Sequence, residues 1–381
     1  MFWPNKINAW HISCLTADPL RPDPVLAGGL EAGRRGVRAR PGDGGRGGPP
    51  KLPWWRRLRR RFYWLLLLAV AGAAERLPVA AGRNCGRALA RVAFGVRTRE
   101  RRVALANLAG ALPEVDDRGR SRLARECADA AGRNLFDTLA AGRLLAAGGV
   151  VAAGGVVAAG GVVADLPDDD GCGLVDRIVA ERAAGRGVLV LSGHLGCWEL
   201  QGAWLARELA ARGEGPLHVV AGTVRNPAVD RWLTRRRVAL GLQVLRREDG
   251  AGPLLGLLRA GGVAAVLVDQ NTAVDSMPVP FFGRPAPTPT GPARLAVGLG
   301  SAVIVTAMSR AADGKGHEVW HAPVWRADRA SPRDEQVDAC LRWTNNHLEA
   351  RIRRNPAEWV WYHRRWEPLK ETAAASDKSG A

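Results

Sequence analysis

From residue 174 onward the chain alternates between short apolar runs and helical segments, and this order restricts the possible folds more than any other feature. Helical patterns at 229–240 and 252–258 lie between some of the apolar runs. Strands that alternate with helices form a largely parallel sheet with helices on both faces. We therefore predict an α/β fold. The runs with the length and composition of buried strands are 187–192, 217–220, 263–268 and 302–307.

Other segments flank this region or interrupt the domain. Residues 1–50 are rich in Gly, Arg and Pro and poor in large apolar side chains, so we expect a disordered extension. Residues 371–381 are expected to form a disordered tail. Residues 146–163 contain three copies of Ala-Ala-Gly-Gly-Val-Val, a pattern that predicts a low-complexity insertion on the surface. The main domain is therefore placed at 81–370, and its first part, to residue 145, is predicted to be helical.

Residues 51–80 combine a basic cluster with an apolar run, which is typical of a membrane anchor. Five arginines follow Trp54 and Trp55, and the apolar run 62–74 comes directly after them. The run is shorter than the roughly 20 residues that span a bilayer. A tilted, barely spanning helix and a helix that lies in the interface both fit this pattern. A buried helix of the domain is a third possibility, but arginines beside Trp and Leu favour the membrane.

The charge of the chain indicates the kind of partner that it meets. The formal net charge is +18, and the 14 Trp far outnumber the 6 Phe and 2 Tyr. Nucleic acid, anionic lipid and an acidic carrier protein could each balance so many positive charges. Trp prefers the membrane–water interface, and we find no clear motif for binding DNA or RNA. We therefore expect an anionic membrane lipid as a partner and no nucleic acid.

One histidine occupies the position where such a sheet usually carries chemistry. His194 comes directly after the predicted strand 187–192, at the edge where open α/β sheets bind ligands. Glu199 follows in the first turn of the next helix, where its carboxylate can converge with the imidazole. A carboxylate bonded to one ring nitrogen raises the basicity of the other. The pair predicts a general base for a hydroxyl, although a helix-capping histidine and a surface glutamate have the same spacing.

Other reactive side chains do not form a second candidate centre. The six cysteines have neither CxxC nor zinc-site spacing, so we expect no metal and no redox cofactor. Cys197 lies in a helical turn and is interpreted as a packing residue. Ser192 lacks the glycine frame of a nucleophile elbow, which argues against a serine hydrolase.

The segments around and after His194 resemble one enzyme family in their order. His-x4-Glu is followed by Val268-Asp269-Gln270-Asn271, then by Met277 to Thr288, and finally by Asn355 to Trp366 with its Trp-x-Trp-x-His-Arg-Arg pattern. This set resembles the bacterial lipid A late acyltransferases, the lauroyl- and myristoyltransferases of the Kdo–lipid A pathway. The resemblance covers roughly residues 54–370 and implies a glycerolipid-acyltransferase-like sheet with an N-terminal membrane-anchoring helix.

The resemblance also implies roles for single residues. His194 would be the catalytic base and Glu199 its partner. Arg225 would bind a phosphate or the oxyanion, unless it is a surface arginine. Asp269 would orient Arg225 or the acceptor, unless it caps a turn. Separately from the resemblance, His363 lies beside Arg364 and Arg365, and we expect it to contact a lipid headgroup or the membrane interface rather than to act in catalysis. The residues implied to shape an acyl groove, or else to belong to the plain core, are Phe281, Phe282 and Gly283.

From these features we predict an acyltransferase on the cytoplasmic face of the inner membrane. The donor is expected to be an acyl thioester on acyl carrier protein or coenzyme A, and the acceptor a hydroxyl of a lipid A precursor. A lysophospholipid or a phosphoinositide glycolipid is the alternative acceptor. More distant alternatives are a basic nucleic-acid-binding protein and an inactive scaffold, and His194 with Glu199 argues against the second.

Overall fold

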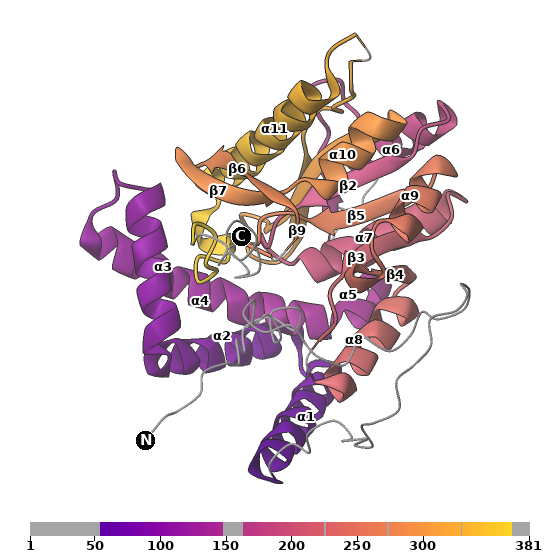
Figure 1. The fold of residues 1–381 in the computed structure, drawn as a ribbon. Helices are drawn as coiled ribbons and strands as arrows, with labels where there is room; N and C mark the ends of the chain where they lie inside the picture. Colours follow the sequence, from indigo (N-terminus) through magenta and orange to yellow (C-terminus); the bar gives the residue numbers. More distant parts are fainter. Residues whose placement is uncertain (1–53, 148–162, 225, 273, 329, 368–381) are drawn as a thin grey trace, which may run out of the picture.

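The computed structural model describes residues 54–147, 163–224, 226–272, 274–328 and 330–367 (Figure 1). The predictions for residues 1–50 and 371–381, for Arg225 and for nearly all of the insertion at 146–163 lie outside the described residues. The described strands are β1 (Val163–Asp165), β2 (Val188–Ser192), β3 (Leu217–Ala221), β4 (Leu242–Arg246), β5 (Val263–Leu267), β6 (Ser276–Phe281), β7 (Arg284–Pro289), β8 (Ala302–Arg310) and β9 (His317–His321).

Helices precede the sheet in the chain and then alternate with its strands. The α-helices are α1 (Trp54–Ala74), α2 (Val79–Val96), α3 (Thr98–Ala111), α4 (Asp117–Leu139), α5 (Ala141–Ala147), α6 (Leu174–Ala183), α7 (Trp198–Ala211), α8 (Pro227–Ala239), α9 (Gly252–Arg259), α10 (Gly291–Leu299) and α11 (Arg333–Arg354). Two short 3₁₀ helices are η1 (Arg247–Asp249) and η2 (Pro356–Glu358).

Seven strands form one sheet in the order β1-β9-β8-β2-β5-β3-β4. Every neighbouring pair is parallel except β8 and β9. The prediction of a largely parallel α/β sheet is confirmed, and the ends of all four predicted strands agree with the structure to within three residues. Consecutive parallel strands need crossover connections, which the helices provide.

Strand β2 lies at the centre of the sheet and is buried along its whole length. Leu189 and Leu191 face a core that includes α9, α10 and α11. Val188 and Val190 face the opposite core, with α6 and α7. Because side chains alternate between the faces, a strand covered on both sides is apolar throughout. This burial holds the end of β2, and the loop after it, at a fixed place.

Strands β6 and β7 form a separate hairpin that the sequence did not reveal. Phe282 and Gly283 make its two-residue turn with φ values of 53° and 68°. Such turns need positive φ at both positions, which is rare for an aromatic residue. The Phe282 ring is only 5% exposed and its N–H donates to the Glu349 carboxylate. Packing and this hydrogen bond therefore stabilise the unusual backbone.

Helix α1 forms where the anchor was predicted, and its two faces differ. Leu67 and Val70 pack, with Ala71, onto a core formed by α4 and α8. Leu58, at 60% exposed, and Phe62, at 61%, face away from it. Among the helices that the structure describes, none is both long and apolar enough to cross a bilayer. The helix is present, and its role at a membrane remains a prediction.

Candidate active site

His194 lies just beyond the C-terminal end of β2 and is bonded to a carboxylate. Its Nδ1 lies 2.7 Å from Asp269 Oδ1, and its backbone N–H donates to Asp269 Oδ2 at 2.6 Å. Asp269 follows β5, which pairs with β2 in parallel, so the two strand ends meet at one edge of the sheet. The Asp269 carboxylate is hydrogen-bonded to Nδ1 of the imidazole, and this leaves Nε2 to act as a base.

Two glycines allow this arrangement. A Cβ atom at position 193 would stand 2.8 Å from Asp269 Oδ2, so a side chain there would displace the carboxylate. Gly196 has a φ of 61°, and a Cβ atom there would lie 1.9 Å from the carbonyl oxygen of Met308. Glycine adopts positive φ without steric cost. The glycines around His194 therefore let the loop pass close to Asp269 and β8.

Glu199 is not the carboxylate that orients His194, and the predicted pairing is wrong. Its carboxylate instead accepts hydrogen bonds from both Nε and Nη2 of Arg237 on α8, the first at 3.1 Å. In the first turn of α7, the Glu199 side chain extends toward α8, whereas the His194 ring turns toward the end of β5. Asp269, which we expected to orient Arg225 or the acceptor, takes the place assigned to Glu199.

Trp359 makes a further contact with the pair. Its indole N–H donates to Asp269 Oδ2 at 2.7 Å, and both side chains are buried. Burial raises the pKa of the Asp269 carboxyl, but the His194 ring and then the Trp359 N–H outweigh it. The net pKa of Asp269 lies well below its usual range, so the carboxylate is ionised at neutral pH.

His363 lies beside His194 rather than at the surface. The two ring centroids are 5.0 Å apart, edge to face, and His363 is 6% exposed. Burial, followed by the nearby His194, lowers the pKa of His363 to about 3, so its imidazole is neutral at physiological pH. Arg365 is fully buried and donates to Pro287 and Thr288. Because His363 is buried, the expectation that it contacts a headgroup or the membrane interface is wrong.

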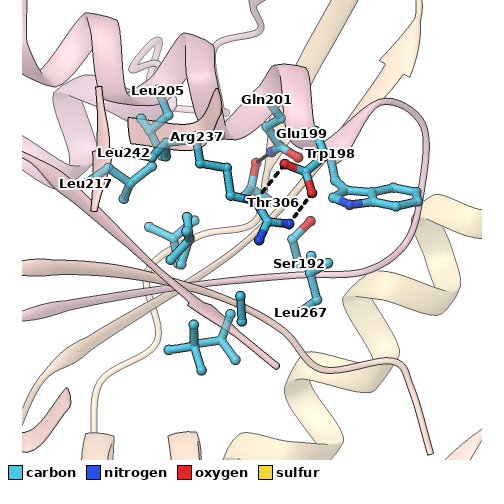
Figure 2. Close-up of a pocket in the computed structure, with 17 residues that line it drawn as sticks. Ser192, Trp198, Glu199, Gln201, Leu205, Leu217, Arg237, Leu242, Leu267 and Thr306 are labelled. Atoms are coloured by element: carbon cyan, nitrogen blue, oxygen red, sulfur yellow. Dashed lines mark hydrogen bonds and ion pairs between the residues drawn. The ribbon is translucent and has the colours of Figure 1, made fainter. Parts of the chain in front are cut away.

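An apolar pocket lies between α7 and the sheet (Figure 2). Its cavity volume is about 80 Å³. Trp198 lines the pocket and also touches His194, with ring centroids 4.9 Å apart. His194 therefore contacts a wall of the pocket, although it is not itself a lining residue. Its apolar side chains include Val190, Leu205, Leu217, Val219, Leu242 and Leu267.

The polar groups of the pocket lie near the end of β2. The Glu199–Arg237 pair lines it, and Figure 2 shows the Ser192 hydroxyl beside them. Ser192 is 6% exposed, and its Oγ has no hydrogen-bond partner among the described residues. A buried hydroxyl without a partner is costly. A ligand with an oxygen atom at this point would supply that partner.

The residues predicted to shape an acyl groove occupy a different place. Phe281 is fully buried, and its ring lies 5.7 Å from that of Trp359. Phe282 stacks on the same indole at 6.4 Å. Gly283 completes the turn of the hairpin. None of the three lines the pocket of Figure 2, and their role in binding an acyl chain stays a prediction.

Cys197 is a packing residue, as interpreted from the sequence. It is 1% exposed, and its Sγ contacts the hydroxyl of Thr138 and the carbonyl oxygen of Asn134. Burial raises the pKa of the thiol to about 12, so thiolate is scarce at neutral pH. Within the described residues, no group of three or more His, Cys, Asp or Glu side chains is arranged to hold a metal ion.

Three residues of the site were not predicted from the sequence. Arg237 was not singled out, and Trp359 was included only as part of a motif. Ser192 was considered only as a nucleophile. The sequence did contain a signal for Asp269, because this residue, like His194, directly follows a predicted strand. Which strands are neighbours, however, depends on the sheet order, and the sequence pattern does not contain it.

Comparison with known proteins relates this geometry to one family. The family described as bacterial lipid A biosynthesis acyltransferase matches residues 162–368. A phosphatidylinositol mannoside acyltransferase of Mycobacterium tuberculosis (strain CDC 1551 / Oshkosh) is 28% identical over 212 residues, which cover 54% of this chain and 63% of that protein. The lipid A biosynthesis lauroyltransferase of Escherichia coli (strain K12) is 28% identical over 195 residues, 50% of this chain and 59% of that protein. The chain thus spans about 60% of the length of these relatives.

Proposed function

The chain belongs to the bacterial lipid A biosynthesis acyltransferase family, and we propose that it transfers a fatty acyl group from an acyl thioester to a hydroxyl of a membrane glycolipid. The observation that carries the proposal is the buried His194–Asp269 pair, whose imidazole contacts Trp198 in the wall of an apolar pocket. A base and an apolar pocket are what such a reaction requires from the protein. The base activates the hydroxyl, and the pocket holds the acyl chain.

The chemistry follows from the hydrogen bonds of His194. Its Nε2 takes the proton of the acceptor hydroxyl while the oxygen attacks the thioester carbonyl carbon. The tetrahedral intermediate collapses with cleavage of the C–S bond, and the proton on Nε2 passes to the departing thiolate. Asp269 keeps Nδ1 protonated and stabilises the imidazolium that forms between the two steps.

The pocket supports binding of the acyl chain in one orientation. Apolar side chains of α7, β3 and β4 surround its body, and the polar groups lie near the end of β2. The methyl end of the chain would lie among Leu205, Leu217 and Leu242. The carbonyl would then lie near Ser192, whose hydroxyl gains an acceptor. Trp198 lines the same pocket and contacts His194.

The proposed donor is acyl carrier protein or acyl-CoA. Both thiol carriers are acidic, and a basic surface accelerates their encounter with the enzyme. Arg231 and Arg235 are exposed on α8, the same helix that contributes Arg237 to the pocket. We place the donor on this face because its thioester then enters beside Ser192.

Two acceptors fit the comparisons, and both are phosphate-bearing glycolipids. The family match favours a lipid A precursor. Relatives named phosphatidylinositol mannoside acyltransferase, from two Mycobacterium tuberculosis strains and from Mycolicibacterium smegmatis, favour a phosphoinositide glycolipid. We propose the shared chemistry, a sugar hydroxyl of an anionic glycolipid, and treat the choice between the two as a question for experiment.

We also propose that the protein works on the cytoplasmic face of the inner membrane. The outer face of α1 carries exposed Trp54, Leu58 and Phe62. Arg59, Arg60 and Arg61 lie between Leu58 and Phe62 in the sequence and so flank this apolar row on the helix. An apolar face with adjacent arginines is suited to a helix that lies in an anionic interface. Such a location brings the pocket close to both an acyl donor from the cytoplasm and a lipid acceptor.

The test is transfer by the purified full chain. Radiolabelled acyl carrier protein and acyl-CoA serve as donors, and a Kdo–lipid A precursor, a phosphatidylinositol mannoside and a lysophospholipid serve as acceptors. We expect transfer to one of the glycolipids, and a loss of about 10²–10⁴ in rate for His194→Ala. If neither donor acylates any of the three lipids, or if His194→Ala keeps the wild-type rate, the proposal is wrong.

A further inference from the structure

Trp359 connects the C-terminal segment of the chain to the His194–Asp269 pair. Its indole N–H and the backbone N–H of His194 donate to the same Asp269 oxygen, at 2.7 Å and 2.6 Å. The other oxygen bonds to His194 Nδ1 at 2.7 Å. Both carboxylate oxygens are therefore fixed, and rotation of the carboxylate would break the bonds to His194 and Trp359 together.

The backbone beside Trp359 holds the loop of His194 as well. Trp359 forms an antiparallel bridge with Leu195, and the Gly196 N–H donates to the Glu358 carbonyl oxygen at 3.0 Å. The segment that contains Trp359 thus contacts the two residues directly after His194. It also contacts the Asp269 carboxylate, which is hydrogen-bonded to His194. Since the segment is remote in sequence from both, it sets their relative position independently of β2 and β5.

The indole itself has little freedom. Trp359 is 1% exposed. The ring of Trp361 lies 4.7 Å away, edge to face, and the rings of Phe281 and Phe282 pack on other sides. This aromatic packing orients the indole N–H toward Asp269. It also explains the position of the Phe-Phe-Gly hairpin, because the two phenylalanine rings are part of the packing.

We propose that Trp359 is a positioning residue for acyl transfer, which holds Asp269 in register with His194 and withdraws part of its negative charge from the imidazole. The inference rests on the proposed function for its effect on rate. Among the described residues, His363 and Arg365 are titratable groups that also interact with the pair, the second through Asp269. Both belong to the segment that carries Trp359.

Trp359→Phe keeps an aromatic ring and removes the N–H. We expect kcat to fall between about 10- and 100-fold, the range for a lost hydrogen bond to a charged group, with KM nearly unchanged. The freed charge on Asp269 favours the imidazolium, so the acidic limb of the pH–rate profile should move to higher pH. The matched control is Trp361→Phe, since Trp361 is equally buried in the same cluster but donates to the Pro356 carbonyl oxygen.

Equal kcat and equal pH profiles for the two variants would overturn the proposal. A measurement that needs no acyl transfer, the NMR signal of His194, tests the positioning role of Trp359 separately from the proposed function. In protein labelled with ¹⁵N-histidine, with His194→Gln for assignment, the His194 Nδ1–H signal and its titration should change in Trp359→Phe and stay unchanged in Trp361→Phe. An unchanged signal in Trp359→Phe would refute the positioning role, whether or not the acyltransferase assay succeeds.

Discussion

The carboxylate of Glu199 accepts two hydrogen bonds from the guanidinium of Arg237, and this ion pair joins the first turn of α7 to α8. Both side chains are largely buried, with 13% and 11% of their surface exposed. The pair lines the pocket beside the carboxyl end of β2 (Figure 2). Glu199 therefore contributes to the walls of the pocket, while Asp269 orients the base.

This division of roles predicts different effects for the two carboxylates. In Asp269→Asn, the amide oxygen would accept from Trp359 and the amide N–H₂ would face His194 Nδ1. The imidazole then carries its proton on Nε2, where the base is needed, so we expect kcat to fall by about 10³–10⁴. Steady-state rates with saturating donor and acceptor check this. Circular dichroism confirms that the variant is folded.

Glu199→Gln should instead act mainly on stability. It leaves Arg237 buried without its partner, and breaking a buried pair costs about 3–5 kcal/mol. The double variant Glu199→Gln/Arg237→Met should recover part of this loss in urea denaturation. If Glu199→Gln lowered kcat as much as Asp269→Asn while its unfolding midpoint stayed unchanged, the assignment of roles would be reversed.

The sequence was sufficient to predict the strands of the sheet centre because burial on both faces leaves a continuous apolar run. β2 is such a strand. β4 was missed, since it lies at the edge of the sheet and its five residues Leu-Gln-Val-Leu-Arg include two polar side chains. β9 was also missed, because only alternate residues of His317–His321 are fully buried and the strand breaks the parallel order.

Residue partners were harder to predict than strands. His194 and Asp269 were both placed after predicted strands, yet their contact depends on β2 and β5 being neighbours. Glu199 is nearer to His194 in sequence, but the direction of its side chain depends on where α8 packs. The local spacing could therefore identify the base, while the identity of its partner is a property of the tertiary structure.

The pocket predicts a site that controls acyl-chain length. Gly202 lines it from α7, and a Cβ atom there would meet only Leu242 Cδ atoms, at 3.7 and 4.0 Å. Gly202→Leu should fill part of the pocket and lower turnover of a 16-carbon donor at least tenfold relative to an 8-carbon donor. The control Gly202→Ala makes only ordinary contacts and should change this ratio little. An unchanged ratio in Gly202→Leu would place the acyl chain elsewhere.

His363 predicts how stability depends on pH. Burial lowers its pKa to about 3, against about 6.5 in the unfolded chain, so between these values the unfolded state binds the additional proton. The free energy of unfolding should therefore decrease as pH falls below about 6.5, by up to about 1.4 kcal/mol per pH unit from this residue. His363→Gln should remove that contribution. Urea denaturation between pH 7 and pH 4.5 measures it, and equal slopes for wild type and variant would contradict the burial argument.

Helix α1 predicts where the protein meets a membrane. Leu58, Phe62 and Leu65 are each at least 60% exposed and lie along one side of the helix, whereas Leu67 and Val70 pack against the domain. Full burial of each side chain yields about 1.5–3 kcal/mol. Replacing the three exposed residues with Ser should thus reduce binding to anionic vesicles at least tenfold, without unfolding the domain. Sedimentation with vesicles of phosphatidylglycerol and phosphatidylcholine measures the effect.

A second exposed apolar row provides the matched control for this experiment. Leu89, Val92 and Val96 on α2 are between 63% and 77% exposed and carry a similar apolar area. If α1 is the contact, serine at these three positions should leave most vesicle binding intact. Replacing Arg59, Arg60 and Arg61 with Gln should weaken binding most at low salt, where their attraction to anionic lipid is least screened. Loss of binding from the α2 variant, with the α1 variant still bound, would move the membrane contact to α2.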